Sequence, residues 1–154
     1  RTIMWLRRDH PVLRRRRFFT GDAGHGGESE LGEIEWLTPA GESMTDQDWT
    51  TWYARAMMVF LNGDAIAEPD ERGQRIVDNS FLVLINASDE DITFTLPGEG
   101  YSPTWKVALD TAPAVDGDSD PVLAADDTVV VEARSMLFLM DAPDSTATTE
   151  RLQH

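Results

Sequence analysis

The stretch from residue 80 to residue 97 constrains the fold of this chain more than any other. Residues 81–85 form an unbroken run of apolar, strand-forming residues, which predicts a strand that is buried on both faces. A polar turn follows at residues 88–91, and between residues 92 and 96 apolar side chains alternate with threonines, as in a strand with one face on a core. We therefore predict a β-hairpin at the centre of a mainly β domain.

The rest of the chain adds further short strands separated by turns. A short helical turn is expected within residues 44–52, where Thr45 or Asp46 can serve as its N-cap. The turn signal at residues 62–64 ends one of the apolar strands. The additional predicted strands are 34–37, 55–61, 104–109, 128–132 and 136–140. About seven short strands at this spacing predict an antiparallel β-sandwich.

The N-terminal segment has a helical pattern instead. Ile3, Leu6 and Leu13 share one apolar face, which Met4 and Trp5 widen. A proline interrupts the pattern, because the residue before a proline avoids the helical conformation. The helix begins without a capping residue, and nothing in this sequence precedes it to cover the apolar face. We therefore interpret the segment as the end of a larger upstream unit.

The composition of the chain excludes several classes of protein. Its 154 residues include no cysteine, which rules out disulfides, thiolate metal sites and a cysteine nucleophile. The longest apolar run, residues 56–61, is too short to cross a bilayer, and no signal peptide opens the chain, so we expect a cytoplasmic protein with no membrane partner. The net charge of −15 argues against binding to nucleic acid, which needs a basic face.

Charge is unevenly distributed along the chain. Residues 1–17 contain seven arginines and one acid, whereas the remainder is strongly acidic. The basic segment is therefore expected to be drawn toward an acidic surface, either of this domain or of a neighbour. An equally simple interpretation is that the arginines at positions 14–17 only solvate the end of a helix.

Most residue groups that could carry chemistry fail on their spacing. Asp116, Asp118 and Asp120 alternate as calcium-loop ligands do, and Asp127 falls at the twelfth position, but Pro121 replaces the glycine that the turn needs. A solvated acidic loop is the simpler interpretation. The three histidines are scattered and match no zinc or Ser-His-acid pattern, and among 28 acidic residues a close carboxylate pair is no evidence for a catalytic dyad. We predict no catalytic residue, no metal site and no cofactor.

The five tryptophans are the remaining candidates for a binding surface. A large flat ring with a polar nitrogen can stack on a sugar, although most tryptophans belong to cores or interfaces. Trp49 and Trp52 lie in a segment that is not a strand, so they are the candidate sugar-contacting residues.

Three stretches of the chain, together with two shorter ones, carry a family resemblance. They are Trp5–Phe19, Trp36–Met44 with Asp48 and Trp49, and Phe60–Asp64 continuing to Gly73, Asp78 and Phe81–Ala87, with Leu109–Thr111 and Ala133–Ser135. In combination they resemble the C-terminal end of bacterial isoamylase-type glycogen debranching enzymes, which are glycoside hydrolases of the α-amylase superfamily. The resemblance covers nearly the whole chain except the tail. Ala40 departs from the Pro-Asp-Gly turn that is usual in the family, but the turn tolerates that change.

The resemblance implies a fold, a set of partners and a reaction. Residues 1–19 would form the last helix of a catalytic (β/α)8 barrel, residues 20–53 a connection with a short strand and a helical turn, residues 54–141 the C-terminal β-sandwich, and residues 142–154 a disordered tail. The parent enzyme would hydrolyse α-1,6 branch linkages in glycogen or limit dextrins, so its partners would be the upstream barrel and an α-glucan. The catalytic acids of the family belong to barrel strands upstream of Arg1, so this chain would supply none of them.

Two other classes of function stay open. The sandwich could be a carbohydrate-binding module with Trp49 or Trp52 as its platform. It could also be a protein-interaction domain whose basic helix docks on an acidic partner, which high salt would then release.

Overall fold

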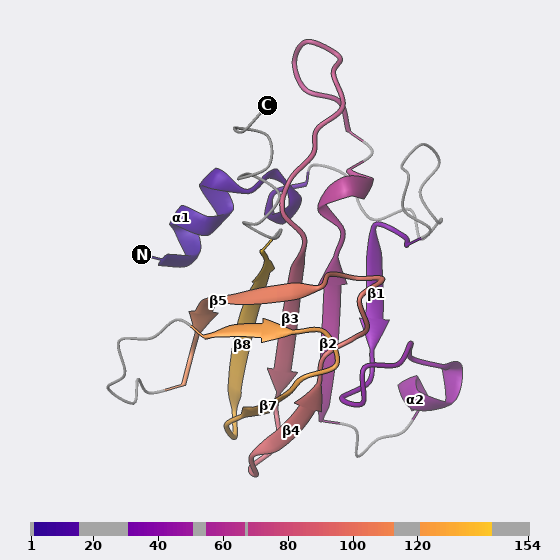
Figure 1. Ribbon diagram of the computed structural model, residues 1–154, viewed down its shortest axis with the longest axis vertical. Coiled ribbons are helices and arrows are strands. Elements are labelled where there is room, and N and C mark those ends of the chain that lie inside the picture. Colours follow the sequence, from indigo (N-terminus) through magenta and orange to yellow (C-terminus); the bar gives the residue numbers. More distant parts are fainter. Residues whose placement is uncertain (1, 16–30, 51–54, 67, 113–120, 143–154) are drawn as a thin grey trace, which may run out of the picture.

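The computed structural model describes residues 2–15, 31–50, 55–66, 68–112 and 121–142 (Figure 1). The helical elements are α1 (Thr2–Asp9), the 3-10 turn η1 (Pro11–Leu13), α2 (Asp46–Thr50) and the 3-10 turn η2 (Gly63–Ala65). The strands are β1 (Ile34–Leu37), β2 (Ala56–Leu61), β3 (Phe81–Asn86), β4 (Ile92–Thr95), β5 (Thr104–Asp110), β6 (Val122–Ala124), β7 (Thr128–Val131) and β8 (Ser135–Asp141). Residues 20–30 and 51–54 of the predicted connection and residues 143–154 of the predicted tail lie outside the described residues.

The strands form two antiparallel sheets. Six of them lie in the order β1-β2-β3-β8-β5-β6, and β4 pairs with β7 in a second, two-stranded sheet. Figure 1 shows α1 near one end of the large sheet and the β4–β7 pair near the other end. The predicted mainly β, antiparallel architecture is confirmed, and the additional strand is β6, which lies in the predicted acidic loop.

The main core lies between the two sheets. Side chains from the large sheet, including the fully buried Trp105 and Phe60, pack against Phe94 and Val131 of the small one. Burial of large apolar side chains of this kind is the dominant favourable contribution to folding. The buried members of this core are Leu37, Ala56, Met58, Phe60, Leu82, Leu84, Phe94, Leu96, Trp105, Val131, Leu137 and Leu139.

The predicted hairpin between β3 and β4 is wrong. β3 pairs with β2 and β8 in the large sheet, whereas β4 pairs with β7 in the small one. The chain therefore crosses from one sheet to the other at residues 87–91. The buried Asn86 fixes this crossing, because its side-chain amide donates to the carbonyl oxygens of Glu90, Val131 and Glu132 at 2.8, 3.0 and 3.1 Å.

The prediction that β3 is buried on both faces is confirmed. Residues 81–84 are buried and Ile85 is partly buried. Leu82 and Leu84 face the main core, and Phe81 on the opposite face belongs to a second apolar cluster with residues near the N-terminus. β3 is therefore an interior strand with apolar neighbours on both sides.

The predicted helical turn is α2, and Thr45 rather than Asp46 is its cap. The Asp48 backbone N–H donates to Thr45 Oγ1 at 3.4 Å, while the Asp48 carboxylate accepts from the Thr45 backbone N–H at 2.7 Å. This reciprocal pair is a capping box with aspartate in the place of glutamate. The bonds from Thr45 hold the pKa of Asp48 below its ordinary value.

Candidate functional site

The N-terminal helical segment is fixed to one end of the sandwich by an apolar cluster. Leu6 of α1 and Val12 of η1 are buried together with Ile66 and Phe81. Partly buried side chains surround this group, among them Leu13, Leu61 and Met140. α1 and η1 therefore pack directly on the large sheet instead of extending into solvent.

Asp78 joins the same segment to the sandwich by polar contacts. Its Oδ1 atom lies 2.9 Å from His10 Nδ1, and its Oδ2 accepts from the backbone N–H of Val12 at 3.0 Å. The side chains of His10 and Asp78 are only 15% and 8% exposed, so water weakens this contact little. The His10 ring also meets Phe81 edge-on, with ring centroids 4.9 Å apart.

Gly63 allows the loop that carries Asp78 to approach η2. The Asp78 backbone N–H donates to the Gly63 carbonyl at 3.1 Å, and the Gly63 backbone N–H donates to Ser80 Oγ at 3.0 Å. A Cβ atom at position 63 would lie 2.1 Å from the Asp78 carbonyl oxygen. Only glycine fits here without a backbone shift.

Arg15, two residues after the end of η1, makes a second polar connection to the sandwich. One Nη atom donates to the Asn62 carbonyl at 3.1 Å, and the other lies 3.4 Å from Glu33 Oε2. Burial lowers the pKa of Arg15, and the nearby carboxylates of Glu33 and Glu68 oppose that shift. Removal of one partner would leave a partly desolvated charge, so the contacts of Arg15 stabilise the packing of this segment on the sandwich.

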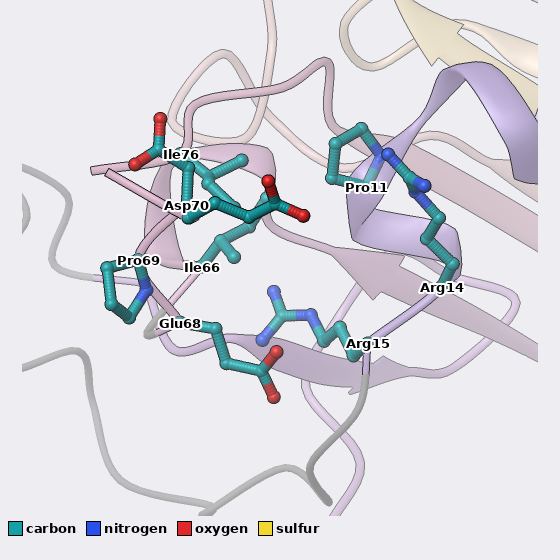
Figure 2. Close-up of a pocket in the computed structure, with 9 residues that line it drawn as sticks. Pro11, Arg14, Arg15, Ile66, Glu68, Pro69, Asp70 and Ile76 are labelled. Carbon is teal, nitrogen blue, oxygen red and sulfur yellow. The ribbon is translucent and has the colours of Figure 1, made fainter. Parts of the chain in front are cut away.

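A cavity of about 260 Å³ opens beside Arg15. Figure 2 shows the Arg15 guanidinium and the Glu68 carboxylate directed into it from opposite sides. Glu68 Oε1 is buried and has no hydrogen-bond partner among the described residues. The cavity is lined by Pro11, Arg14, Arg15, Ile66, Glu68, Pro69, Asp70, Glu71 and Ile76, so it offers charged groups but no histidine or hydroxyl nucleophile.

The predicted apolar face of the N-terminal helix is divided between two environments. Leu6 is buried against the sandwich, whereas Ile3, Met4 and Trp5 are 58%, 72% and 55% exposed. Three large apolar side chains on one eight-residue helix form an exposed patch of the kind found at protein interfaces. We call Ile3, Met4 and Trp5 the helix patch.

The candidate sugar-contacting residues have different outcomes. Trp49 of α2 is half exposed and meets Trp36 of β1 edge-on, with ring centroids 5.3 Å apart. Trp52 lies outside the described residues. The sequence did not indicate that Trp36 would join Trp49, because the contact depends on the chain folding back beside β1, where the Met44 backbone N–H donates to the Trp36 carbonyl at 2.9 Å. The described tryptophans therefore offer one exposed pair.

The acidic residues that alternate as calcium-loop ligands do lie mostly outside the described ranges. Within the described ranges, no group of three or more His, Asp or Glu side chains could hold a metal ion. Asp116, Asp118 and Asp120 lie outside those ranges, and the Asp127 carboxylate accepts from the Ala124 backbone N–H at 2.9 Å, as a turn residue does. Among the described helices, none is long and apolar enough to cross a membrane.

Residues 33–142 match the family described as "Isoamylase, C-terminal", which covers β1 to β8 and both sheets. The chain belongs to the isoamylase C-terminal family. Curated relatives of this isoamylase C-terminal domain include the "Glycogen operon protein GlgX homolog" of Mycobacterium bovis and of two strains of Mycobacterium tuberculosis, each 49% identical over 134 residues. The match covers 87% of this chain but only 18% of the length of each relative.

The family match includes β1 and α2, which lie in the segment predicted to be a connection. β1 pairs with β2 along its whole length, so it is the edge strand of the large sheet. The α1–η1 segment precedes the matched residues. The isoamylase C-terminal domain and the helical segment that packs on it therefore meet at the contacts of Asp78 and Arg15.

Proposed function

We propose that this chain is the C-terminal part of a glycogen debranching glycoside hydrolase that cleaves α-1,6 branch linkages in glycogen or limit dextrins. Membership of the isoamylase C-terminal family supports this proposal, as do relatives whose printed name is "Glycogen operon protein GlgX homolog". The catalytic acids would lie in an upstream (β/α)8 barrel, and the enzyme would work in the cytoplasm. The part described here would be structural.

The observation that carries the structural role is the position of the helix patch. Leu6 fixes α1 to the sandwich, and Asp78 fixes the segment that follows. Ile3, Met4 and Trp5 are thereby held outward in a defined orientation. In the proposed enzyme, α1 is the last helix of the barrel, and the helix patch packs on the barrel's own helices.

Hydrolysis of branched glucans tests this function. The full-length enzyme should release linear oligosaccharides from glycogen and from a limit dextrin, whereas the 154-residue chain alone should release none. Reducing ends can be counted before and after digestion with both proteins at equal concentration. Release of sugar by the 154-residue chain, or its absence with the full-length enzyme, would refute the assignment.

Direct contact with the α-glucan is a second candidate role, and the exposure of Trp49 favours it. An indole that is 50% exposed has ring surface that a sugar can reach. Titration with maltooligosaccharides at millimolar concentration should then change tryptophan fluorescence, and Trp49→Ala should abolish the change. An unchanged spectrum at saturating sugar would exclude Trp49 as a sugar platform, and the same comparison applies to Trp52.

A further inference from the structure

The cavity beside Arg15 contains a buried carboxylate oxygen that lacks a donor. Glu68 Oε1 is buried, yet it accepts no hydrogen bond from the described residues. A carboxylate can only accept hydrogen bonds, and a buried acceptor without a donor costs free energy. Figure 2 shows the Glu68 carboxylate directed into the cavity, so a ligand with a donor group can satisfy it there.

The walls of the cavity are fixed by hydrogen bonds of their own. On one side, the Asp70 carboxylate accepts from the backbone N–H groups of Arg72 and Gln74, both at 2.8 Å. The Arg75 guanidinium ties the same loop to η2, because it donates to the Asp64 carbonyl at 2.6 Å. On the other side, η1 is fixed to the sandwich. The cavity is therefore formed before a ligand enters, which lowers the free-energy cost of binding.

The charged part of the lining suits a neutral ligand better than an ion. Groups of both signs line the same space, and they are Arg14, Arg15, Glu68, Asp70 and Glu71. An anion is repelled by the carboxylates, and a cation is repelled by the guanidinium groups. Hydroxyl groups both donate and accept, so a ligand with several hydroxyls can bond to carboxylates and guanidinium groups at once.

Apolar side chains form the rest of the lining. Figure 2 shows Pro11 and Pro69 on opposite sides of the cavity, with Ile66 between them. Ile76 is the fourth apolar residue of the lining. The volume of about 260 Å³ lies just below the ~300–1,000 Å³ of pockets for drug-sized ligands, so the cavity has room for one small ring and not for a chain of rings.

We propose that this cavity binds one glucosyl unit of an α-glucan. A ring hydroxyl donates to Glu68 Oε1, and neighbouring hydroxyls bond to the exposed side chains of Arg14 and Asp70. The lining includes no aromatic residue, so binding here depends on hydrogen bonds and not on ring stacking, unlike binding at Trp49. The choice of glucose as the sugar rests on the proposed function, whereas the choice of a neutral polyhydroxylated ring rests on the lining.

Chemical shifts of backbone amides locate the bound sugar. The 154-residue chain, labelled with ¹⁵N, is titrated with maltotriose and separately with glucose. The amides of Ile66, Asp70 and Ile76 should shift together and saturate with both sugars. The indole N–H of Trp49 reports the other candidate site in the same spectra, and Trp49→Ala should leave the shifts around the cavity unchanged.

Two substitutions of Glu68 test whether the ligand is neutral. Glu68→Ala removes the acceptor and should raise the dissociation constant for maltotriose roughly tenfold or more. Glu68→Gln keeps a side-chain carbonyl that accepts from a hydroxyl, so the constant should rise only roughly threefold to fivefold. Glu99→Ala is the matched control, because Glu99 is exposed and lies outside the lining, and it should leave the constant unchanged. Amides distant from the cavity report whether each variant keeps its fold.

Several outcomes of these titrations would overturn the proposal. The absence of any shift around the cavity at the highest maltotriose concentration would show that water alone fills it. Shifts with glucose but not with maltotriose would assign the cavity to a free sugar. Shifts with sulfate or with spermidine, but with neither sugar, would assign it to an ion. An equally large loss for Glu68→Gln and Glu68→Ala would show that binding needs the charge of Glu68, which a neutral ring does not.

The full-length enzyme tests whether the cavity is used during hydrolysis. Glu68→Ala should raise KM for glycogen roughly threefold or more without a change in kcat, because a residue that only binds the substrate contributes equally to the ground state and the transition state. An unchanged KM would contradict a role of the cavity in the enzyme.

The two proposals fail in different ways. If the full-length enzyme debranches glycogen but maltotriose shifts no amide around the cavity, the function stands and the binding site is wrong. If these amides shift but no branch linkage is cleaved, the binding site stands and the function is wrong.

Discussion

Replacement of Asp78 by alanine should detach the α1–η1 segment without unfolding the sandwich. Two of the hydrogen bonds that its carboxylate accepts cross from this segment, one from Val12 and one from His10 when Nδ1 carries a proton. A hydrogen bond to a charged group contributes about 1.5–3 kcal/mol, and the loss also leaves a buried N–H without an acceptor. We expect the free energy of unfolding to fall by about 3–5 kcal/mol. Solvent screening reduces this loss little, because the side chains of His10 and Asp78 are both largely buried.

The assay for Asp78→Ala is urea denaturation of the 154-residue chain followed by far-UV circular dichroism. Asp70→Ala is the control, because the Asp70 carboxylate also accepts two backbone N–H groups, from Arg72 and Gln74, but in an exposed turn. The control should lose about 1 kcal/mol or less. If Asp78→Ala and Asp70→Ala destabilise the chain equally, Asp78 does not hold the segment in place.

Three further substitutions test other parts of the structure. Gly63→Ala should lower the midpoint of thermal unfolding strongly, because its Cβ would lie 2.1 Å from a backbone oxygen, and a normal midpoint would show that the loop adapts. Asn86→Leu should lower the free energy of unfolding in urea by about 2–4 kcal/mol, because the carbonyl oxygens of Val131 and Glu132 lose their donor; a loss as small as that for a surface site would contradict this role. Burial raises the pKa of Asp141, so its ionisation weakens the folded state at neutral pH and this penalty disappears as pH falls toward the ordinary value of 3.8. Asp141→Asn should therefore raise the unfolding midpoint at neutral pH but not below that value, and a gain that is equal at both pH values would refute the effect of charge.

Local patterns in the sequence predicted most of the strands but not their partners. The apolar run at residues 81–85 correctly predicted a strand buried on both faces. The alternation at residues 92–96 correctly predicted a half-buried strand, yet it said nothing about pairing with residues 128–131. The choice of partner depends on Asn86, whose bonds reach carbonyls 45 and 46 residues away. Such long-range contacts have no local signature.

For the candidate site, as for the strands, the sequence predicted local features but not the contacts between distant residues. The apolar pattern of residues 3–6 indicated a helix with a partner, but only the structure divides it into the buried Leu6 and the exposed helix patch. The contact of Trp36 with Trp49 could not be read from the chain, because it depends on how residues 38–45 fold back beside β1. Which side chains share one face of the large sheet likewise becomes clear only when the register of its strands is known.

Hydrogen exchange of the amides in α1 most directly tests whether this segment joins the sandwich to a larger catalytic body. A helix of eight residues is marginal by itself, so its amides exchange quickly unless both sides are covered. In the full-length enzyme, amides of residues 4–9 should exchange roughly tenfold or more slowly than in the 154-residue chain. Equal exchange in the two proteins would show that nothing packs on the helix patch and would contradict its role in docking.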